Sequence, residues 1–501
     1  MRKRALLPLA LLALALAASP ARAHVGSPNV FYDGDAGPYP VRVIVRPPAV
    51  VPGLAEITVR VKEGEADGVT VQPVQWRAGT KGAPPPDAAQ PVPGDPELWS
   101  AQLWFMEQSS YSVRVHVKGP AGEGTAQVPV SVVPARILKM DVGMGAVLLG
   151  LGVFLFAGAL TLVHAAVRES VLAPGEAPDT GRRTRARVVT ALAGLFLALL
   201  LWGGKGWWDG IDSRAQEAIF KPFGVETAAG FDGGQRVLTL KIEDERSREW
   251  TPLMPDHGKL MHMFLVREPG LDAFAHLHPV PQQKKEELRA ALPPLPAGTY
   301  RVYADVVHES GFPQTLVDTV TLPAAPAAEG ARGTLAPDPD DSWRQASPIA
   351  KASGPAESPL EGGGTMLWHR EPLAANRETT LRFEVRGADG GPVYLEPYMG
   401  MLSHAVVTRD DGKVFVHLHP MGSINMAAQQ VFTRTAGAAA AAMDHSAHSR
   451  HAGHGAPSVV SFPYEFPEPG RYRLWVQVKS GGRVETGVFD AEVASTEPLP
   501  E

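Results

Sequence analysis

"HAVVTRDDGKVFVHLHP", residues 404–420, is the stretch from which the architecture of the C-terminal region follows. Asp411-Gly412 lies between two runs of β-favouring residues, which is the pattern of a two-residue hairpin turn of type I′. Such a turn pairs Asp410 with Lys413 and so fixes the register of both strands. The stretch therefore predicts an antiparallel β-hairpin.

Three histidines of this hairpin fall on one face. Counting outward from the turn places His404 directly opposite His419. Opposed residues have Cβ atoms about 4.5–5.5 Å apart, and residues two apart on one strand point to the same side. His417 therefore joins His404 and His419, and three imidazoles are expected to converge.

A second copy of the pattern, "HMFLVREPGLDAFAHLHP", occupies residues 262–279. A four-residue loop around Pro269-Gly270 would place His262 opposite His278, with His276 beside it. The flanking sequence repeats as well, because "GTYR" at 298–301 corresponds to "GRYR" at 470–473, each opening a penultimate strand.

The repetition predicts two related β-sandwich units, which we call repeat 1 (225–323) and repeat 2 (364–495). Residues 324–362, rich in Ala, Pro, Gly and Asp, are predicted to be a linker. Residues 24–136 contain short β-branched runs separated by Gly, Pro and Asp, which favour a further antiparallel Ig-like sandwich. The predicted fold is mainly β, with several Ig-like antiparallel β-sandwich domains and a two-helix transmembrane hairpin.

Composition excludes several classes of function. The chain has 501 residues and no cysteine, so thiolate metal sites, disulfides and cysteine nucleophiles are excluded. A net charge of −6 over this length does not indicate nucleic acid as a partner.

The N-terminus has the charged, apolar and small-x-small regions of a secretory signal peptide, residues 1–23. Residues 144–167 and 188–206 are apolar enough to be transmembrane helices. The loop between them, 168–187, carries five arginines, so the positive-inside rule predicts a cytoplasmic loop. The protein is then expected in the inner (cytoplasmic) membrane, with its N-terminal and C-terminal domains on the periplasmic or extracellular side.

Three imidazoles on one hairpin can supply three corners of a tetrahedral metal site and leave the fourth open. Imidazole suits zinc, copper and nickel. Methionines flank both hairpins, and Met401 in repeat 2 is a candidate ligand. Thioether sulfur favours copper, especially Cu(I), so copper is the expected cofactor and zinc the alternative.

Further candidate ligands lie outside the hairpins. The insertion "MDHSAHSRHAGHG" at 443–455 is a His-rich tract of the kind that binds metal loosely. His257 is expected to support the first hairpin. Cleavage after Ala23 would leave His24 as an N-terminal residue able to offer amine and imidazole to Cu(II). The tract's candidate ligands are His445, His448, His451 and His454.

The opening "HVGSPNVFYDGDAGPYPVRVIVRPPAVVPGLAEITVRV", residues 24–61, resembles secreted Ig-like domains of the YtkA-like and FixH-like kind. The N-terminal His of the mature chain is similar to that of CopC-like copper carriers. The tract at 443–455 looks like the Met/His-rich segments of bacterial copper-resistance proteins. These resemblances imply copper handling in the cell envelope, or a role in assembling a metal-containing membrane enzyme such as an oxidase.

Three hypotheses remain at this point. The first is a membrane-anchored extracytoplasmic protein that binds, buffers or delivers copper, with another envelope metalloprotein as a candidate partner. The second is a zinc enzyme, because a His-x-His strand with a third His on its neighbour is similar to the zinc site of α-carbonic anhydrases. The third is a structural, partner-binding role, in which the histidines are only a duplicated polar face.

Overall fold

The computed structural model describes residues 24–25, 29–173, 175–217, 219–243, 252–282, 287–324, 335–435 and 458–496. The predicted signal peptide and the four histidines of the 443–455 tract lie outside the described residues. The chain divides into two compact units, one of residues 1–132 and 222–501 and the other of residues 133–221.

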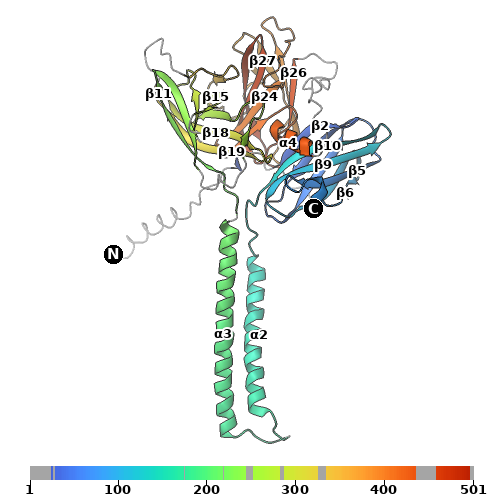
Figure 1. Cartoon of the computed structure of the whole chain (residues 1–501), viewed down its shortest axis with the longest axis vertical. Coiled ribbons are helices and arrows are strands. Elements are labelled where there is room, and N and C mark those ends of the chain that lie inside the picture. The colour runs from blue at the N-terminus through green and yellow to red at the C-terminus, as the bar shows by residue number, and fades with distance from the viewer. Residues whose placement is uncertain are drawn as a thin grey trace. The chain divides into compact units, whose positions relative to one another are not determined.

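The smaller unit holds two long helices, α2 (Val142–Glu169) and α3 (Thr180–Glu217). Figure 1 shows them side by side, running in opposite directions. Asp141 caps α2 by accepting from the Met144 N–H at 3.0 Å. Both helices are long and apolar enough to cross a membrane by length and composition, and they contain the predicted spans.

In the larger unit, the N-terminal sandwich has two sheets around one core. Val43, Ile57 and Leu103 of one sheet pack with Val71 and Val115 of the other. The strands are β2 (Val30–Ala36), β3 (Tyr39–Arg46), β4 (Gly53–Val61), β5 (Gly68–Gln75), β6 (Asp87–Ala88), β7 (Gln90–Val92), β8 (Asp95–Phe105), β9 (Ser109–Gly119) and β10 (Gly122–Val132), with a 3-10 turn, η1 (Thr80–Gly82). Their orders are β2-β3-β4-β8-β7 and β10-β9-β5-β6.

Repeat 1 forms the second sandwich. Its elements are β11 (Gly224–Asp232), β12 (Gln235–Glu243), β13 (Leu253–Met254), β14 (His262–Arg267), β15 (Ala273–Leu277), β16 (Val280–Pro281), β17 (Glu287–Ala291), β18 (Gly298–His308), β19 (Pro313–Leu322) and β20 (Ser342–Gln345). One sheet has the order β11-β12-β17-β16, and the other β13-β18-β14-β15-β20 with β19 paired to β18. Strand β20 belongs to the stretch expected to be a linker, so that stretch extends the sheet that carries the first hairpin.

Repeat 2 forms the third sandwich. Its elements are β21 (Glu357–Pro359), β22 (Thr365–His369), β23 (Glu378–Arg386), β24 (Ser403–Arg409), β25 (Val414–Leu418), α4 (Met426–Thr435), β26 (Val459–Glu465), β27 (Gly470–Ser480) and β28 (Arg483–Val493), joined by β1 (His24–Val25). The orders are β21-β22-β23-β26 and β1-β25-β24-β27-β28. The order β15-β14-β18-β19 of repeat 1 thus recurs as β25-β24-β27-β28. The prediction of a mainly β fold is confirmed.

All three sandwiches share one local feature. A tyrosine hydroxyl donates to the backbone carbonyl four residues upstream, from Tyr111 at 3.2 Å, Tyr300 at 2.8 Å and Tyr472 at 2.7 Å. This is the tyrosine corner typical of Ig-like sandwiches. It explains why the Gly-x-Tyr-Arg sequence recurs at the start of β18 and of β27.

The hairpin β14–β15 is buried on both faces, and so is β24–β25. One face of each fills the core of its own sandwich. The other faces pack against each other: Phe274 stacks on Trp475 with ring centroids 4.8 Å apart, and Phe415 stacks on Tyr303 at 3.8 Å. These are reciprocal pairs, because each joins a hairpin of one repeat to the equivalent central strand of the other.

The registers predicted for the hairpins are confirmed. Ala405 pairs with Leu418, which sets His404 across from His419, and Met263 pairs with Leu277, which sets His262 across from His278.

Both predicted turns are wrong in detail. Gly412 has a φ of 66°, but Asp411 has no positive φ, so the turn is not type I′. The guanidinium of Arg301, in repeat 1, donates to the Asp411 carbonyl at 3.0 Å, so repeat 1 takes part in setting this turn. In the first hairpin, five residues rather than four lie between the strands, 268–272.

Replacing Phe415 by alanine is expected to destabilise the folded protein by about 3–5 kcal/mol, because the side chain is 1% exposed and lies against Tyr303 and Phe264. The thermal midpoint of the full-length protein in detergent should fall by roughly 10 °C. Val317→Ala, at a partly exposed position of repeat 1, is the matched control and should shift it far less. Equal shifts would contradict the described packing of the repeats.

Candidate metal centre

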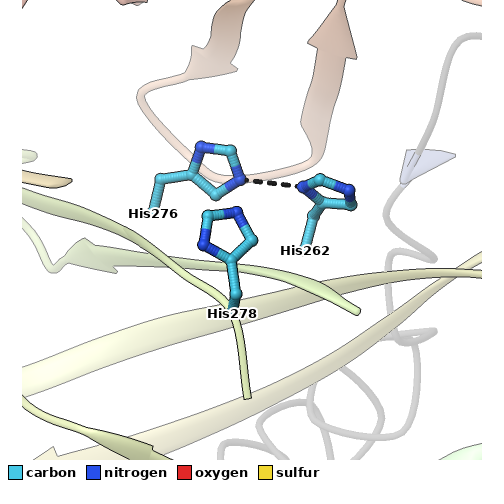
Figure 2. Close-up of side chains that lie close together, drawn as sticks. All are labelled: His262, His276 and His278. Atoms are coloured by element: carbon cyan, nitrogen blue, oxygen red, sulfur yellow. Dashed lines mark hydrogen bonds between the residues drawn. The ribbon is translucent and has the colours of Figure 1, made fainter. Parts of the chain in front are cut away.

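The first three histidines come together at the start of β14 and the end of β15. His262 opens β14, His276 lies in β15, and His278 follows two residues later. Their side chains point toward one another in Figure 2, and one ligand atom of each lies within 4.8 Å of the others. All three are nearly inaccessible to solvent. We call them triad 1.

The second three, triad 2, repeat this geometry on β24 and β25. His404, His417 and His419 are buried, and one ligand atom of each lies within 4.8 Å of the others. The Nδ1 of His404 is 3.2 Å from the Nε2 of His417, matching 3.1 Å between His262 and His276. The structure thus brings together both sets of residues that the hairpin patterns predicted.

Backbone carbonyls fix the proton on three of these rings. A carbonyl can only accept, so His262 donates from Nε2 to Asp256 O at 3.2 Å, and His404 donates from Nε2 to Tyr398 O at 3.1 Å. His419 donates from Nδ1 to Ile424 O at 2.9 Å. The opposite nitrogen of each ring then carries a lone pair.

Side chains orient the other three rings. The Nδ1 of His278 lies 3.0 Å from a carboxylate oxygen of Asp341, and that of His276 lies 2.9 Å from Gln477 Oε1. The Nδ1 of His417 faces Asp305 Oδ2 at 3.4 Å. When these outer nitrogens donate, every inward nitrogen of both triads carries a lone pair. Such outer partners are what orients and tunes metal-binding histidines.

This proton arrangement makes the contact between His262 Nδ1 and His276 Nε2 informative. For it to be a hydrogen bond, one of the two rings would have to give up the hydrogen bond of its outer nitrogen. With both outer bonds kept, two lone pairs face each other at 3.1 Å, and a cation held between them relieves the repulsion. The same holds for His404 and His417. The arrangement can hold a metal ion in each triad.

Each repeat supplies a side chain that orients a histidine of the other repeat. Gln477 of β27 orients His276 of repeat 1, while Asp305 of β18 faces His417 of repeat 2. The two supporting residues are equivalent, since each lies five residues after the corner tyrosine of its strand. Each triad is therefore complete only when the opposite repeat is packed against it.

Across the repeats, the rings of the two triads are nearly as close as rings within one triad. The ring centroids of His262 and His417 are 5.6 Å apart, and those of His276 and His417 are 5.7 Å apart. Neighbours within triad 1 lie 4.7–5.3 Å apart. The six histidines form one cluster at the interface between the repeats.

His257 joins this cluster, although on the other side from the one expected. Its ring lies 5.1 Å from that of His419 and 5.4 Å from that of His404, closer than the 6.1 Å to His262. Its side chain is 3% exposed. It therefore lies nearest the hairpin of repeat 2, and its ring also borders His262 of the first hairpin. Only the packing of the repeats reveals this.

Burial keeps the imidazoles neutral. Loss of hydration, with the nearby histidines, lowers the pKa of His262 to about 3 and that of His419 to about 4. The same causes hold the pKa of His276, His404 and His417 well below the ordinary value. Neutral imidazole is the form that binds metal.

Two carboxyl groups border the cluster, of which Asp256 is buried and Asp305 is 13% exposed. Burial raises the pKa of Asp305 to about 7, against a hydrogen bond from Thr315. Burial also opposes ionisation of Asp256, but neighbouring histidines and the Ala427 N–H, at 2.8 Å, lower its pKa. Asp256 thus lies at the N-terminus of α4, where a helix stabilises negative charge.

The segment 338–341 supplies a further acidic group beside triad 1. Asp338 and Asp341 lie near His278, and these three residues form another arrangement able to hold a cation. The ammonium of Lys259 pairs with Asp338 at 2.6 Å and with Asp340 at 3.2 Å. The composition of this stretch predicted a linker, and its sequence gave no signal of a contact with His278.

Most methionines near the hairpins pack in apolar cores. Met401 lies against the core of the N-terminal sandwich, and Met421 is part of that core. Met261 and Met263 lie in the core of repeat 1. The described packing of Met401 is thus with the N-terminal core, and its role as a ligand stays a prediction.

His24 opens β1, which pairs in parallel with β25 so that His24 lies opposite Val414. Its strand thus extends the hairpin sheet of repeat 2, rather than the sandwich that follows it in sequence.

The metal-free protein is expected to lose stability as the pH falls below about 6.5. The unfolded chain protonates these histidines near that pH, whereas the folded chain holds them neutral, so acid favours unfolding. Each such proton contributes about 1.4 kcal/mol per pH unit. Urea unfolding midpoints between pH 7.5 and 5, measured with a chelator, should fall with pH. His276→Gln/His417→Gln should show a shallower dependence, and equal slopes would contradict the prediction.

Comparison with known proteins adds one family. A model described as "Domain of unknown function (DUF8832)" matches residues 225–323 and 360–495, the regions that carry the two hairpins and somewhat less than half of the chain. The search of curated proteins found no match.

Among solved structures, an engineered protein of the Northeast Structural Genomics Consortium is similar at 20% identity, covering 18% of this chain and 19% of its own, with a TM-score of 0.15. Dimeric latent PorU from Porphyromonas gingivalis is 6% identical over 93% of this chain and 34% of its own, with a TM-score of 0.15. A Parabacteroides merdae β-glucuronidase is 7% identical over 90% and 77%, with a TM-score of 0.14. This chain thus spans about a fifth and a third of the first two, and similarity at these TM-scores carries no argument.

Proposed function

We propose that this protein is a membrane-anchored, extracytoplasmic copper-binding protein that buffers or delivers the ion through its two histidine triads. The observation that carries the proposal is the direction of the six rings. Each has an outer nitrogen facing a carbonyl, amide or carboxylate oxygen, and each can therefore turn a lone pair inward. A duplicated polar face with no ligand would not need this arrangement.

The chemistry of the ligands supports copper. The inward atoms of both triads are imidazole nitrogens, so hard cations such as Ca²⁺ and Mg²⁺, which require oxygen ligands, are poor occupants. Neutral ligands in a buried cluster also favour an ion of low charge, because each uncompensated charge is costly in a low dielectric. Cu(I) meets both conditions. Zn(II) is the alternative that the same ligands allow.

The burial of the ligands supports retention of the ion over turnover of a substrate. The six triad histidines are between 0% and 8% exposed, so an ion bound there is shielded from solvent. A zinc hydrolase needs a coordination position that water and substrate can reach. Buffering or delivery is therefore favoured over the enzymatic hypothesis.

The two apolar helices support the location. The arginines of the connecting segment predict that it faces the cytoplasm, which would place the three sandwiches on the extracytoplasmic side. The N-terminal resemblance to envelope copper proteins points to the same compartment.

Full-length protein in detergent is expected to bind two Cu(I) ions per chain in competition with a chromophoric Cu(I) chelator. The background should be a variant with His445, His448, His451 and His454 replaced by alanine, which leaves the triads as the main histidine sites. In it, His276→Gln/His417→Gln should lose both ions, because each triad keeps only two rings. Parallel titrations with Cu(II) and Zn(II) give the preferred ion.

The matched control is His369→Gln, at an exposed position paired with Glu384 at 3.0 Å, and it should bind like the parent. Circular dichroism checks that both variants are folded. Equal binding by the parent and the double variant would refute the proposal. A preference for Zn(II) would refute copper and favour zinc.

Gln477→Leu removes the oxygen that orients His276 and is expected to weaken binding of one ion about 10–100-fold. Gln72→Leu in the N-terminal sandwich, where the side chain donates to Pro84 O, is the control and should leave both affinities unchanged. Unchanged affinity in Gln477→Leu would show that the orientation of His276 does not depend on repeat 2.

A further inference from the structure

We propose that the two triads form a single binuclear centre, completed across the repeat interface by His257 at triad 2 and Met399 at triad 1. This inference rests on the proposed metal binding but goes beyond it, since two independent sites in separate sandwiches would satisfy the proposed function equally well.

The spacing of the rings argues for one centre. His417 of triad 2 has ring centroids 5.6 Å from His262 and 5.7 Å from His276, close to the spacing within a triad. An ion bound by imidazole lies about 2 Å from each nitrogen. Two ions held by rings this close would be on the order of 5 Å apart, somewhat farther than the roughly 3.5–4 Å of two-metal catalytic sites.

His257 has the properties of a ligand that crosses the interface. It belongs to repeat 1, yet its ring lies against His404 and His419 of repeat 2. Its side chain is 3% exposed, and its Nε2 has no hydrogen-bond partner among the described residues, the nearest carboxylate oxygen being Asp256 Oδ2 at 4.0 Å. Leaving a buried polar atom unpaired costs about 1–3 kcal/mol. Binding an ion in triad 2 would remove that cost.

Met399 occupies the equivalent position in repeat 2. His257 lies five residues before His262, and Met399 lies five residues before His404. Both have a left-handed backbone, with φ of 51° and 50°, and each is followed by a glycine with φ of 81° or 82°. The residue before each one supplies the carbonyl that accepts from the opening histidine of its triad.

Contacts between the two repeats occur in equivalent pairs, which would extend the equivalence of His257 and Met399 from their backbone to their contacts. The stacked pair Phe274–Trp475 has its counterpart in Phe415–Tyr303. The same relation would place Met399 against triad 1, as the counterpart of His257 against triad 2. The two turns meet, since a Cβ placed on Gly400 would lie 4.0 Å from His257 Nδ1. Met399 is 9% exposed, and no apolar core cluster of the described residues contains it.

The two metal positions of the centre would differ in their ligands. Triad 2 with His257 offers four imidazoles, whereas triad 1 with Met399 offers three imidazoles and a thioether. Soft sulfur favours Cu(I), so the ion in triad 1 should be the harder of the two to oxidise.

The test uses the full chain in detergent, with the 443–455 histidines replaced by alanine and loaded with copper(II) alone. Electron paramagnetic resonance should show spin coupling between the ions, as lost intensity relative to the Cu(II) found chemically, or as a half-field transition. His417→Gln should leave one ion with full, uncoupled intensity. Two bound ions with the intensity of two isolated spins would overturn the binuclear centre while leaving the proposed function intact. Absence of Cu(II) binding together with absence of Cu(I) binding in the chelator competition would instead refute the proposed function.

Two further variants test the cross-repeat ligands. His257→Gln should weaken one of the two ions at least tenfold, and unchanged affinities would overturn its role. X-ray absorption of the Cu(I)-loaded protein should show sulfur scattering that disappears in Met399→Leu. Met401→Leu, which alters a side chain packed on the N-terminal sandwich, is the control and should keep the signal. Sulfur scattering that survives in Met399→Leu would overturn the assignment of Met399.

Discussion

The face-to-face packing of the two histidine hairpins is the constraint on which the rest of the larger unit depends. Phe274 on Trp475 and Phe415 on Tyr303 stack across the interface and exclude water from the surface between the repeats. An isolated sandwich could leave this face of its sheet in solvent. Because the second repeat covers it, polar side chains on that face must find partners inside the protein.

At the interface, only the outer nitrogen of each triad histidine has such a partner. Burying an imidazole without a hydrogen bond is unfavourable, and in each triad the outer nitrogens face Asp256, Tyr398, Ile424, Asp341, Gln477 or Asp305. The Nε2 atoms of His278 and His419 have no hydrogen-bond partner within the described part of the chain. A metal ion bound between the rings would give these two atoms a partner.

Duplication explains how so dense a cluster is built from a simple motif. One His-x-His hairpin places three rings on one face of its sheet. The hairpin of the other repeat supplies the second triad and covers the first. The outer partners then diverge, with Gln477 where the other repeat has Asp305, and Met399 where it has His257. Such changes alter the charge and the side-chain chemistry beside one triad, while His257 and Met399 keep the same backbone conformation.

The sequence by itself determined the mainly β fold, the two apolar helices, the duplicated hairpins and the register that gathers each triad. Strand alternation and turn spacing are local, so His404, His417 and His419 could be grouped from a count along the chain. The turn conformation at Asp411 could not, because Arg301 of the other repeat contacts it. Only the tertiary structure decided that the triads adjoin, that His257 faces triad 2, that Asp341 orients His278, and that Met401 packs elsewhere. Those contacts join residues far apart in sequence, and no periodicity along the chain encodes which faces of separate sandwiches meet.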